Sequence, residues 1–178
     1  MPELSLFSYE IMGLVGTGGA APHDLLRMAR RGRILDWAGE SQYYVEPKRL
    51  AKLGYLEARK EPGRTRERTR YALTEQGRDA LREWMREPSP FSRIQLEPAW
   101  RLLAADLTGD EAVLASLRPL REEIADLLVR IDAGEEIART LPRRERYLLL
   151  NHRLARRIVE AHAEWLDEVE RELESYAA

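Results

Sequence analysis

The hydrophobic positions in the first half of the chain begin with a helical period. Apolar residues recur at spacings of three and four over 4–16, from Pro22 onward and over 41–53, which predicts three helices. Ser41 is a suitable N-cap for the third helix, because its hydroxyl can accept a backbone N–H of the first turn. Pro47 lies inside this helix, so either the helix bends there or its regular part begins at that position.

Two strands are expected next, because apolar and polar residues alternate over 55–59 and 68–73. Pro62-Gly63 supplies the turn between them. A fourth helix is expected to begin at Thr74, whose hydroxyl can cap it. The apolar stripe of this helix comprises Leu81, Trp84 and Met85. A helix followed by an arginine-rich ribbon is the outline of a winged helix, a shape that binds DNA.

A domain boundary is predicted at the two prolines that follow. Pro88 and Pro90 cannot continue a helix, so we expect a winged-helix domain over 1–87 and a helical domain over 88–178. The predicted fold class is mainly α, with an N-terminal winged helix-turn-helix that has a two-stranded wing and a C-terminal long-helix dimerisation domain.

Two long helices are predicted in the second domain. Thr108 and Glu111 have capping-box spacing and mark the start of the first, whose end is bracketed by Ala133-Gly134 and Pro142. The second carries apolar residues at helical spacing over 147–176. We expect an antiparallel pair that docks on a second copy of the chain, with an intramolecular bundle as the alternative. The residues expected at the dimer interface are Leu117, Ile124, Leu154, Ile158, Trp165 and Leu173.

Charge is distributed unevenly along a chain whose net charge is only −2. Residues 1–86 hold 16 Lys and Arg against 12 Asp and Glu, a balance of +4, whereas residues 87–178 hold 13 against 19, a balance of −6. A basic half beside an acidic half suggests that the first half meets a polyanion, although a solvated charged surface is the simpler alternative. The basic residues expected to contact DNA from the wing are Arg59, Lys60, Arg64, Arg66, Arg68 and Arg70.

Two motifs resemble the PadR family of winged-helix transcriptional regulators. They are YxxxKRLxxLGYL over 44–56 and RYALTEQGRDALREWM over 70–85. The resemblance covers roughly 4–87 at the level of motifs, and the rest matches as a charged helical region, which that family uses for dimerisation. The chain departs from the family at Pro22-His23, where Gly-Tyr is usual, and at Pro47, where Leu is usual.

The third helix is the expected recognition helix. Its DNA-contacting residues are predicted to be Ser41, Gln42, Tyr44, Lys48, Arg49 and Lys52. Gln42 and Tyr44 are the candidates for reading bases, because recognition helices contact bases mostly through their N-terminal residues. The two lysines and the arginine are expected to hold the phosphate backbone.

Members of the resembled family bind small aromatic or hydrophobic effectors where domains or subunits meet. The aromatic and imidazole side chains that could line such a pocket here are Trp84, Trp100, Tyr147 and His152. For each tryptophan, core packing is the simpler explanation.

Catalytic and metal-binding motifs are not found in the sequence. There are no cysteines, the three histidines form no motif, and the paired glutamates fit a solvated helix surface. We therefore expect no enzyme activity, no cofactor and no metal. No apolar run approaches the ~20 residues of a membrane span and no signal peptide is visible, so a cytoplasmic location is expected.

The sequence thus predicts a homodimeric repressor that binds double-stranded DNA at a pseudo-palindromic operator and is released by a small-molecule effector. The alternative is a winged-helix adaptor that binds proteins and does not read DNA sequence.

Overall fold

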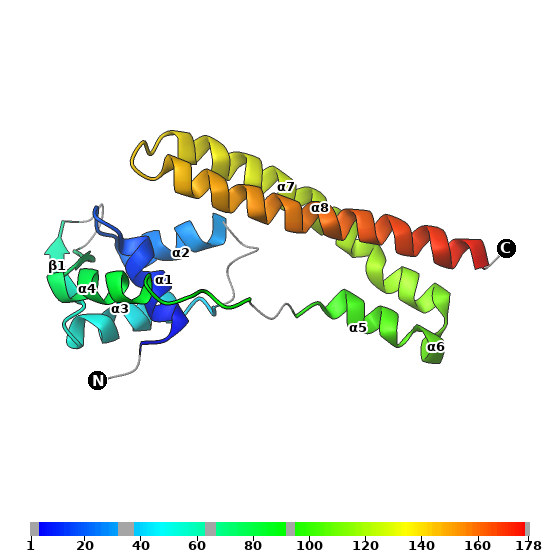
Figure 1. Cartoon of the computed structure of the whole chain (residues 1–178), viewed down its shortest axis with the longest axis horizontal. Helices are drawn as coiled ribbons and strands as arrows, with labels where there is room; N and C mark the ends of the chain where they lie inside the picture. Colours follow the sequence, from blue (N-terminus) through cyan, green and yellow to red (C-terminus); the bar gives the residue numbers. More distant parts are fainter. Residues whose placement is uncertain (1–3, 32–37, 63–66, 92–94, 177–178) are drawn as a thin grey trace. The chain divides into compact units, whose positions relative to one another are not determined.

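A computed structural model of the chain describes residues 4–31, 38–62, 67–91 and 95–176. Packing divides the chain into two units, Met1–Pro90 and Phe91–Ala178, each of which is described by itself. Most described residues are helical, and one two-stranded antiparallel sheet lies in the first unit (Figure 1). The predicted fold class, mainly helical with a two-stranded wing and long C-terminal helices, is confirmed.

The N-terminal unit follows the predicted order of elements. These are α1 (Leu6–Val15), α2 (Pro22–Arg31), α3 (Gln42–Lys52), β1 (Leu56–Glu61), β2 (Arg68–Leu73) and α4 (Glu75–Trp84). The core combines the apolar sides of α1, α2 and α3 with the base of the ribbon. Its largest buried side chains include Phe7, Ile11, Met12, Leu25, Tyr43, Leu50 and Tyr71.

Reciprocal hydrogen bonds begin α1. The Ser5 hydroxyl accepts the Ser8 N–H at 3.2 Å, while the Ser8 hydroxyl accepts the Ser5 N–H at 3.0 Å. Two free donors of the first turn are satisfied in this way. The helix ends at Gly16, whose φ of 53° is favourable for glycine and whose N–H bonds to the carbonyl of Met12.

The start of α3 differs from the expected cap. Ser41 occupies the N-cap position, but its side chain makes no capping hydrogen bond, so that prediction is wrong. Backbone carbonyls close the first turn instead, because Gly39 accepts the N–H of Gln42 at 3.0 Å. The helix continues through Pro47 to Lys52, so its regular part does not begin at the proline. The Pro47 ring itself is buried.

The ribbon is an antiparallel hairpin in which Leu56 pairs with Leu73 and Glu61 pairs with Arg68. Ala20 joins this sheet through one bridge, exchanging two backbone hydrogen bonds of 2.9 and 2.8 Å with Tyr71. This bridge ties the loop between α1 and α2 to the wing.

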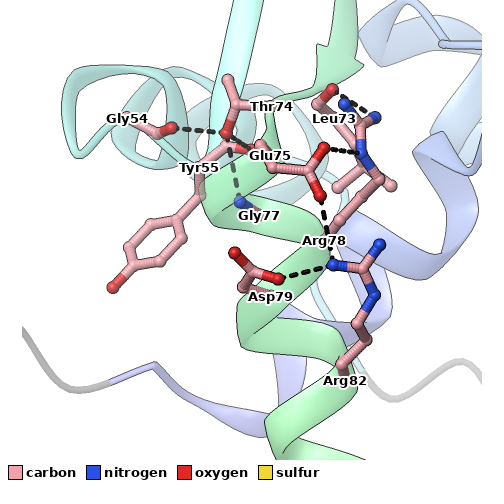
Figure 2. A network of polar contacts seen from close by, with 9 residues as sticks. All are labelled: Gly54, Tyr55, Leu73, Thr74, Glu75, Gly77, Arg78, Asp79 and Arg82. Atoms are coloured by element: carbon pink, nitrogen blue, oxygen red, sulfur yellow. Dashed lines mark hydrogen bonds and ion pairs between the residues drawn. The ribbon is translucent and has the colours of Figure 1, made fainter.

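The docking of α4 explains the most specific motif in the sequence (Figure 2). The Thr74 hydroxyl accepts the N–H of Gly77 at 3.1 Å, which confirms the predicted cap. The same hydroxyl lies 2.6 Å from the carbonyl oxygen of Gly54 and 3.0 Å from that of Tyr55. A Cβ at Gly77 would lie 2.2 Å from the Tyr55 carbonyl oxygen, so the backbones approach too closely for any side chain there. Met85 is 74% exposed, so its predicted place in a buried stripe is wrong.

The C-terminal unit contains α5 (Glu97–Leu103), α6 (Ala105–Thr108), α7 (Asp110–Arg139) and α8 (Glu145–Tyr176). The two long helices pack side by side as an antiparallel pair (Figure 1). Ion pairs cross between them, because Arg121 binds Asp167 at 2.6 Å and Arg156 binds Asp132 at 2.5 Å. These ion pairs connect the two helices at their surface.

The predicted capping box at the start of the first long helix is wrong, whereas the predicted position of its end is confirmed. Thr108 lies in α6 and its hydroxyl bonds back to the Ala104 carbonyl, while Gly109, with φ of 87°, separates α6 from α7. No side chain caps α7. The helix passes through Gly134 and ends at Arg139, within the predicted bracket between Gly134 and Pro142. Gly134 is buried at a close contact, where a Cβ would lie 2.8 Å from Nε2 of His152.

Most of the buried apolar residues of α8 lie one position after the residues that were predicted to be buried. Its buried apolar residues are Ala155, Val159, Leu166 and Val169. Tyr147, Leu150 and Leu154 are instead 66%, 52% and 53% exposed in the single chain. The helix therefore carries two lines of apolar residues: a buried line that includes Ala155 and Val159, and an exposed line that comprises Tyr147, Leu150 and Leu154.

None of the helices in the described ranges is long and apolar enough to span a bilayer.

Candidate nucleic-acid interface

Three inward side chains fix the orientation of α3. Tyr43, Pro47 and Leu50 are buried in the core at helical spacing. The Tyr43 ring meets the Phe7 ring edge to face at 5.1 Å, and its hydroxyl donates to Glu10 at 3.0 Å. The opposite side of the helix is consequently exposed. That side comprises Ser41, Gln42, Val45, Lys48 and Lys52.

The two lysines on this side are available to a partner. Within the described part of the chain, neither Lys48 nor Lys52 forms an ion pair or a hydrogen bond through its side chain. Gln42, the predicted base reader, is exposed beside them, whereas Tyr44 is half-buried against the core. The exposed side of α3 therefore combines two cations with a side-chain amide.

Arg49 is held differently, on the side of α3 that faces α1. Its Nε donates to Glu46 Oε2 at 2.8 Å and its Nη2 to Glu46 Oε1 at 2.7 Å. The same Nη2 lies 3.0 Å from the hydroxyl of Ser8, which in turn donates to Glu46 Oε1 at 2.7 Å. The three groups form a closed network between α1 and α3, here called the Ser8 network.

The Ser8 network is more buried than the ion pairs on the surface of the wing. Ser8 is fully buried, and the side chains of Glu46 and Arg49 are 12% and 38% exposed. Burial alone would raise the pKa of Glu46, but hydrogen bonds from Arg49 and Ser8 outweigh it and hold that pKa below its ordinary value. The carboxylate is therefore ionised at neutral pH and keeps the Arg49 guanidinium in place.

Sequence reasoning did not identify this network. The spacing of Glu46 and Arg49 is a signal for an ion pair on one helix. Ser8, in contrast, lies 41 residues before Arg49, and no local pattern links the two.

The wing presents cations that are already paired. Arg59 lies 2.9 Å from Glu57, and Lys60 lies 2.9 Å from Glu67, with all four side chains more than half exposed. The hydrogen bond from Arg59 lowers the pKa of Glu57. Such exposed pairs are weak, so a phosphate can replace the carboxylate. Arg64 and Arg66, together with the predicted turn residue Gly63, lie outside the described residues.

Arg68 and Arg70 reach back toward the body of the N-terminal unit. Arg70 Nη2 donates to the carbonyl oxygens of Gly18 and Gly19 at 2.7 and 3.0 Å. Arg68 lies 3.8 Å from Asp24 in α2 and 3.6 Å from Glu61. Arg70 therefore helps to hold the ribbon against the loop between α1 and α2, and Arg68 lies within ion-pair distance of α2.

The residues predicted for dimerisation fall into two groups. Leu117 and Ile124 are buried in the single chain, at 2% and 7% exposure. Leu154 is 53% exposed, and Ile158, Trp165 and Leu173 are half-buried. The second group lies on α8 and still has surface to offer a partner.

The residues predicted for an effector pocket are divided between the two units. In the N-terminal unit, Trp84 stacks on Tyr9 with ring centroids 4.7 Å apart. In the C-terminal unit, Trp100 and Tyr147 are 64% and 66% exposed. Nδ1 of His152 is buried without a hydrogen-bond partner among the described residues, and burial lowers the pKa of this histidine. The predicted pocket stays a prediction.

No group of three or more potential metal ligands occurs within the described ranges.

No protein-family model matches the chain, and no curated protein sequence does. Solved structures do match. PadR of Bacillus subtilis in complex with operator DNA aligns over 96% of this chain and 99% of its own, with a TM-score of 0.80 and 19% identity. The virulence activator AphA of Vibrio cholerae aligns over 95% and 98%, with a TM-score of 0.74 and 23% identity.

A second structure of Bacillus subtilis PadR, in complex with p-coumaric acid, aligns over 94% of this chain and 95% of its own, with a TM-score of 0.68 and 18% identity. The resemblance predicted from the sequence motifs is thereby confirmed at the level of the fold. The chain has the fold of the PadR-type winged-helix transcriptional regulators.

Proposed function

We propose that this chain is a DNA-binding transcriptional regulator that places the exposed side of α3 in the major groove. The observation that carries the proposal is the pair Lys48 and Lys52, which are exposed and unpaired in the described chain beside Gln42. The core residues of α3 leave this side facing outward, and lysines without carboxylate partners are suited to phosphates. The wing lies in the same unit and adds Arg59 and Lys60.

The fold supports the same proposal. Bacillus subtilis PadR, whose structure is similar along nearly the whole chain, has been solved with operator DNA. We assign the phosphate contacts of α3 to Lys48 and Lys52, and we assign Arg49 to the positioning of α3 against α1. Gln42 is the proposed base-reading residue, as its exposure and its place in the first turn allow.

We further propose that the chain acts as a homodimer. The support is the second apolar line of α8, in which Tyr147, Leu150 and Leu154 are more than half exposed. Burying such a line against a second copy stabilises a dimer by roughly 25 cal/mol for each Å² of apolar surface removed from water. A two-fold dimer would bind a pseudo-palindromic operator with half-sites about 34–36 Å apart, or a multiple of this distance.

We further propose that the chain is a repressor and that a small-molecule effector releases it from DNA. Bacillus subtilis PadR has been solved with p-coumaric acid, which makes a small aromatic molecule the class of effector to test first. Trp84, Trp100, Tyr147 and His152 are the proposed contacts. A regulator of this kind would work in the cytoplasm, together with the DNA.

The test is a binding titration of the purified chain against the DNA upstream of its own gene, at two salt concentrations. The proposal expects tight binding that prefers this DNA over a scrambled duplex and weakens with salt, because phosphate contacts release counterions. Equal and weak binding to both duplexes would favour the protein-binding adaptor instead.

A further inference from the structure

Val45 lies at the centre of the exposed side of α3. Its side chain is 61% exposed. It follows Ser41 by four residues and precedes Lys48 by three, so the three side chains share one face of the helix. Single apolar side chains are common on protein surfaces, so exposure alone assigns no role to Val45. Its position between a hydroxyl and a lysine on the outer side of α3 is what requires an explanation.

The surroundings of Val45 leave few other groups for reading bases. The Ser8 network holds Arg49 against α1, and Tyr43 is buried with its hydroxyl bonded to Glu10. Tyr44 is half-buried against the core. Because recognition helices contact base edges mainly through their N-terminal residues, the remaining candidates in that half of α3 are Ser41, Gln42 and Val45. Of these, Val45 is apolar and cannot form a hydrogen bond with a base through its side chain.

The chemistry of the major groove supplies a partner for such a side chain. Thymine presents a 5-methyl group there, and apolar side chains recognise it by contact. Valine carries two methyl groups on Cβ and strongly prefers one χ1 rotamer in a helix, so the contact is organised before DNA binds.

We propose that Val45 is a specificity-determining residue that reads the methyl group of one thymine in each half-site. The inference rests on the proposed DNA-binding function and adds a base preference to it. Gln42 supplies hydrogen bonds on one side of this contact, and Lys48 supplies charge on the other.

The experiment replaces thymine by uracil, which removes the 5-methyl group and leaves base pairing unchanged. The full-length chain first selects its preferred duplex from a random library. Each thymine of that duplex is then replaced in turn by deoxyuridine, and the affinity is measured. For the wild type we expect one thymine per half-site at which the replacement weakens binding about fourfold, the value of one buried methyl-sized group.

Variants then assign this effect to Val45. In Val45→Ala the same replacement should change the affinity less than 1.5-fold, because the shorter side chain no longer reaches the methyl group. In Val45→Ile the fourfold effect should persist. Lys48→Gln is the matched control, which should bind more weakly overall and keep the fourfold effect. Circular dichroism of each variant verifies the fold, which an exposed substitution leaves intact.

Two results would overturn the inference about Val45 and leave the proposed DNA-binding function standing. One is a preferred duplex in which no thymine is sensitive to removal of its methyl group, and the other is a Val45→Ala variant with unchanged sensitivity. A selection that returns no preferred sequence would overturn the proposed function and this inference together.

Discussion

The two units of the chain differ in what they leave exposed. In the N-terminal unit, α1, α2 and α3 bury their apolar sides in one core, and α3 presents Lys48 and Lys52 outward. In the C-terminal unit, one apolar line of α8 is buried, while a second, at Leu150 and Leu154, is more than half exposed. The first unit therefore completes its core within the chain and offers charge to a partner. The second offers apolar surface, as a protein interface does.

The largest effect is expected at the closed core of the N-terminal unit. In Gly77→Ala the new Cβ would lie 2.2 Å from the Tyr55 carbonyl oxygen, a backbone atom that cannot rotate away. The helix must shift, so we expect the free energy of unfolding to fall by about 3 kcal/mol. Urea denaturation of the purified variant measures this change.

Gly13 provides the control for that substitution. It lies inside α1, and a Cβ there would meet nothing within 4 Å. Gly13→Ala should therefore raise the free energy of unfolding, by up to about 1 kcal/mol, through helix propensity. If the free energy of unfolding changed in the same direction in both variants, the close approach of the backbones at Gly77 would be contradicted.

The exposed line of α8 is expected to control self-association. In the double variant Leu150→Glu with Leu154→Glu, charges replace side chains that would be buried in the dimer. We expect the dimer to weaken at least about tenfold, while the helical content stays unchanged. Analytical ultracentrifugation measures the dissociation constant.

Val159 is the matched position on the buried line of α8, at 3% exposure. Val159→Glu should unfold the C-terminal unit, because it places a charge in the core of that unit. If the Leu150 and Leu154 double variant associates as tightly as the wild type, the proposed role of the exposed line is wrong.

Disrupting the Ser8 network is expected to lower the free energy of unfolding by a smaller amount, which depends on pH. The pKa of Glu46 is lower in the folded chain than its ordinary value. Its ionised form therefore stabilises the fold above about pH 4.3, and this contribution disappears as the pH falls through the folded pKa. We expect Glu46→Gln to be less stable than the wild type by about 1 kcal/mol at pH 7, with a smaller difference at pH 3.

Urea denaturation at the two pH values tests this prediction. The control is Glu57→Gln on the wing, where the carboxylate is 52% exposed and no measurable change is expected. A Glu46→Gln effect that is the same at both pH values would show that the charge of Glu46 is not what stabilises the network.

Features set by neighbouring residues were predicted correctly from the sequence. Thr74 caps α4, Pro22 opens α2, and two antiparallel strands form where the sequence predicts them, although burial does not alternate along either strand. In the first two cases the cause is a hydroxyl or a ring within a few positions. The motif from Leu73 to Gly77 was recognisable as well, although its reason, the contact with Tyr55, is visible only in three dimensions.

Predictions failed where a distant or competing partner decides the outcome. Thr108 had the spacing of a cap, but the adjacent Gly109 starts α7 instead. The end of α7 falls between Gly134 and Pro142 as predicted, but the close approach of His152 to Gly134 is visible only in the folded chain. On α8 both Leu154 and Ala155 fit an apolar stripe, and only packing in the folded chain selects the second. The contacts of Arg49 with Ser8 and Glu46 could likewise not be predicted, because Ser8 is distant in the sequence; the predicted role of Arg49 in DNA binding stays a prediction.

The central claim is that the outward side of α3, rather than the side facing α1, contacts the phosphates of DNA. The most direct test compares Lys48→Gln with Arg49→Gln, measuring how the affinity for the selected duplex depends on salt. We predict that Lys48→Gln reduces the slope of log affinity against log salt by about 0.9 for each phosphate that the lysine neutralises, and that Arg49→Gln leaves the slope unchanged. A slope that is reduced by Arg49→Gln and not by Lys48→Gln would contradict the claim.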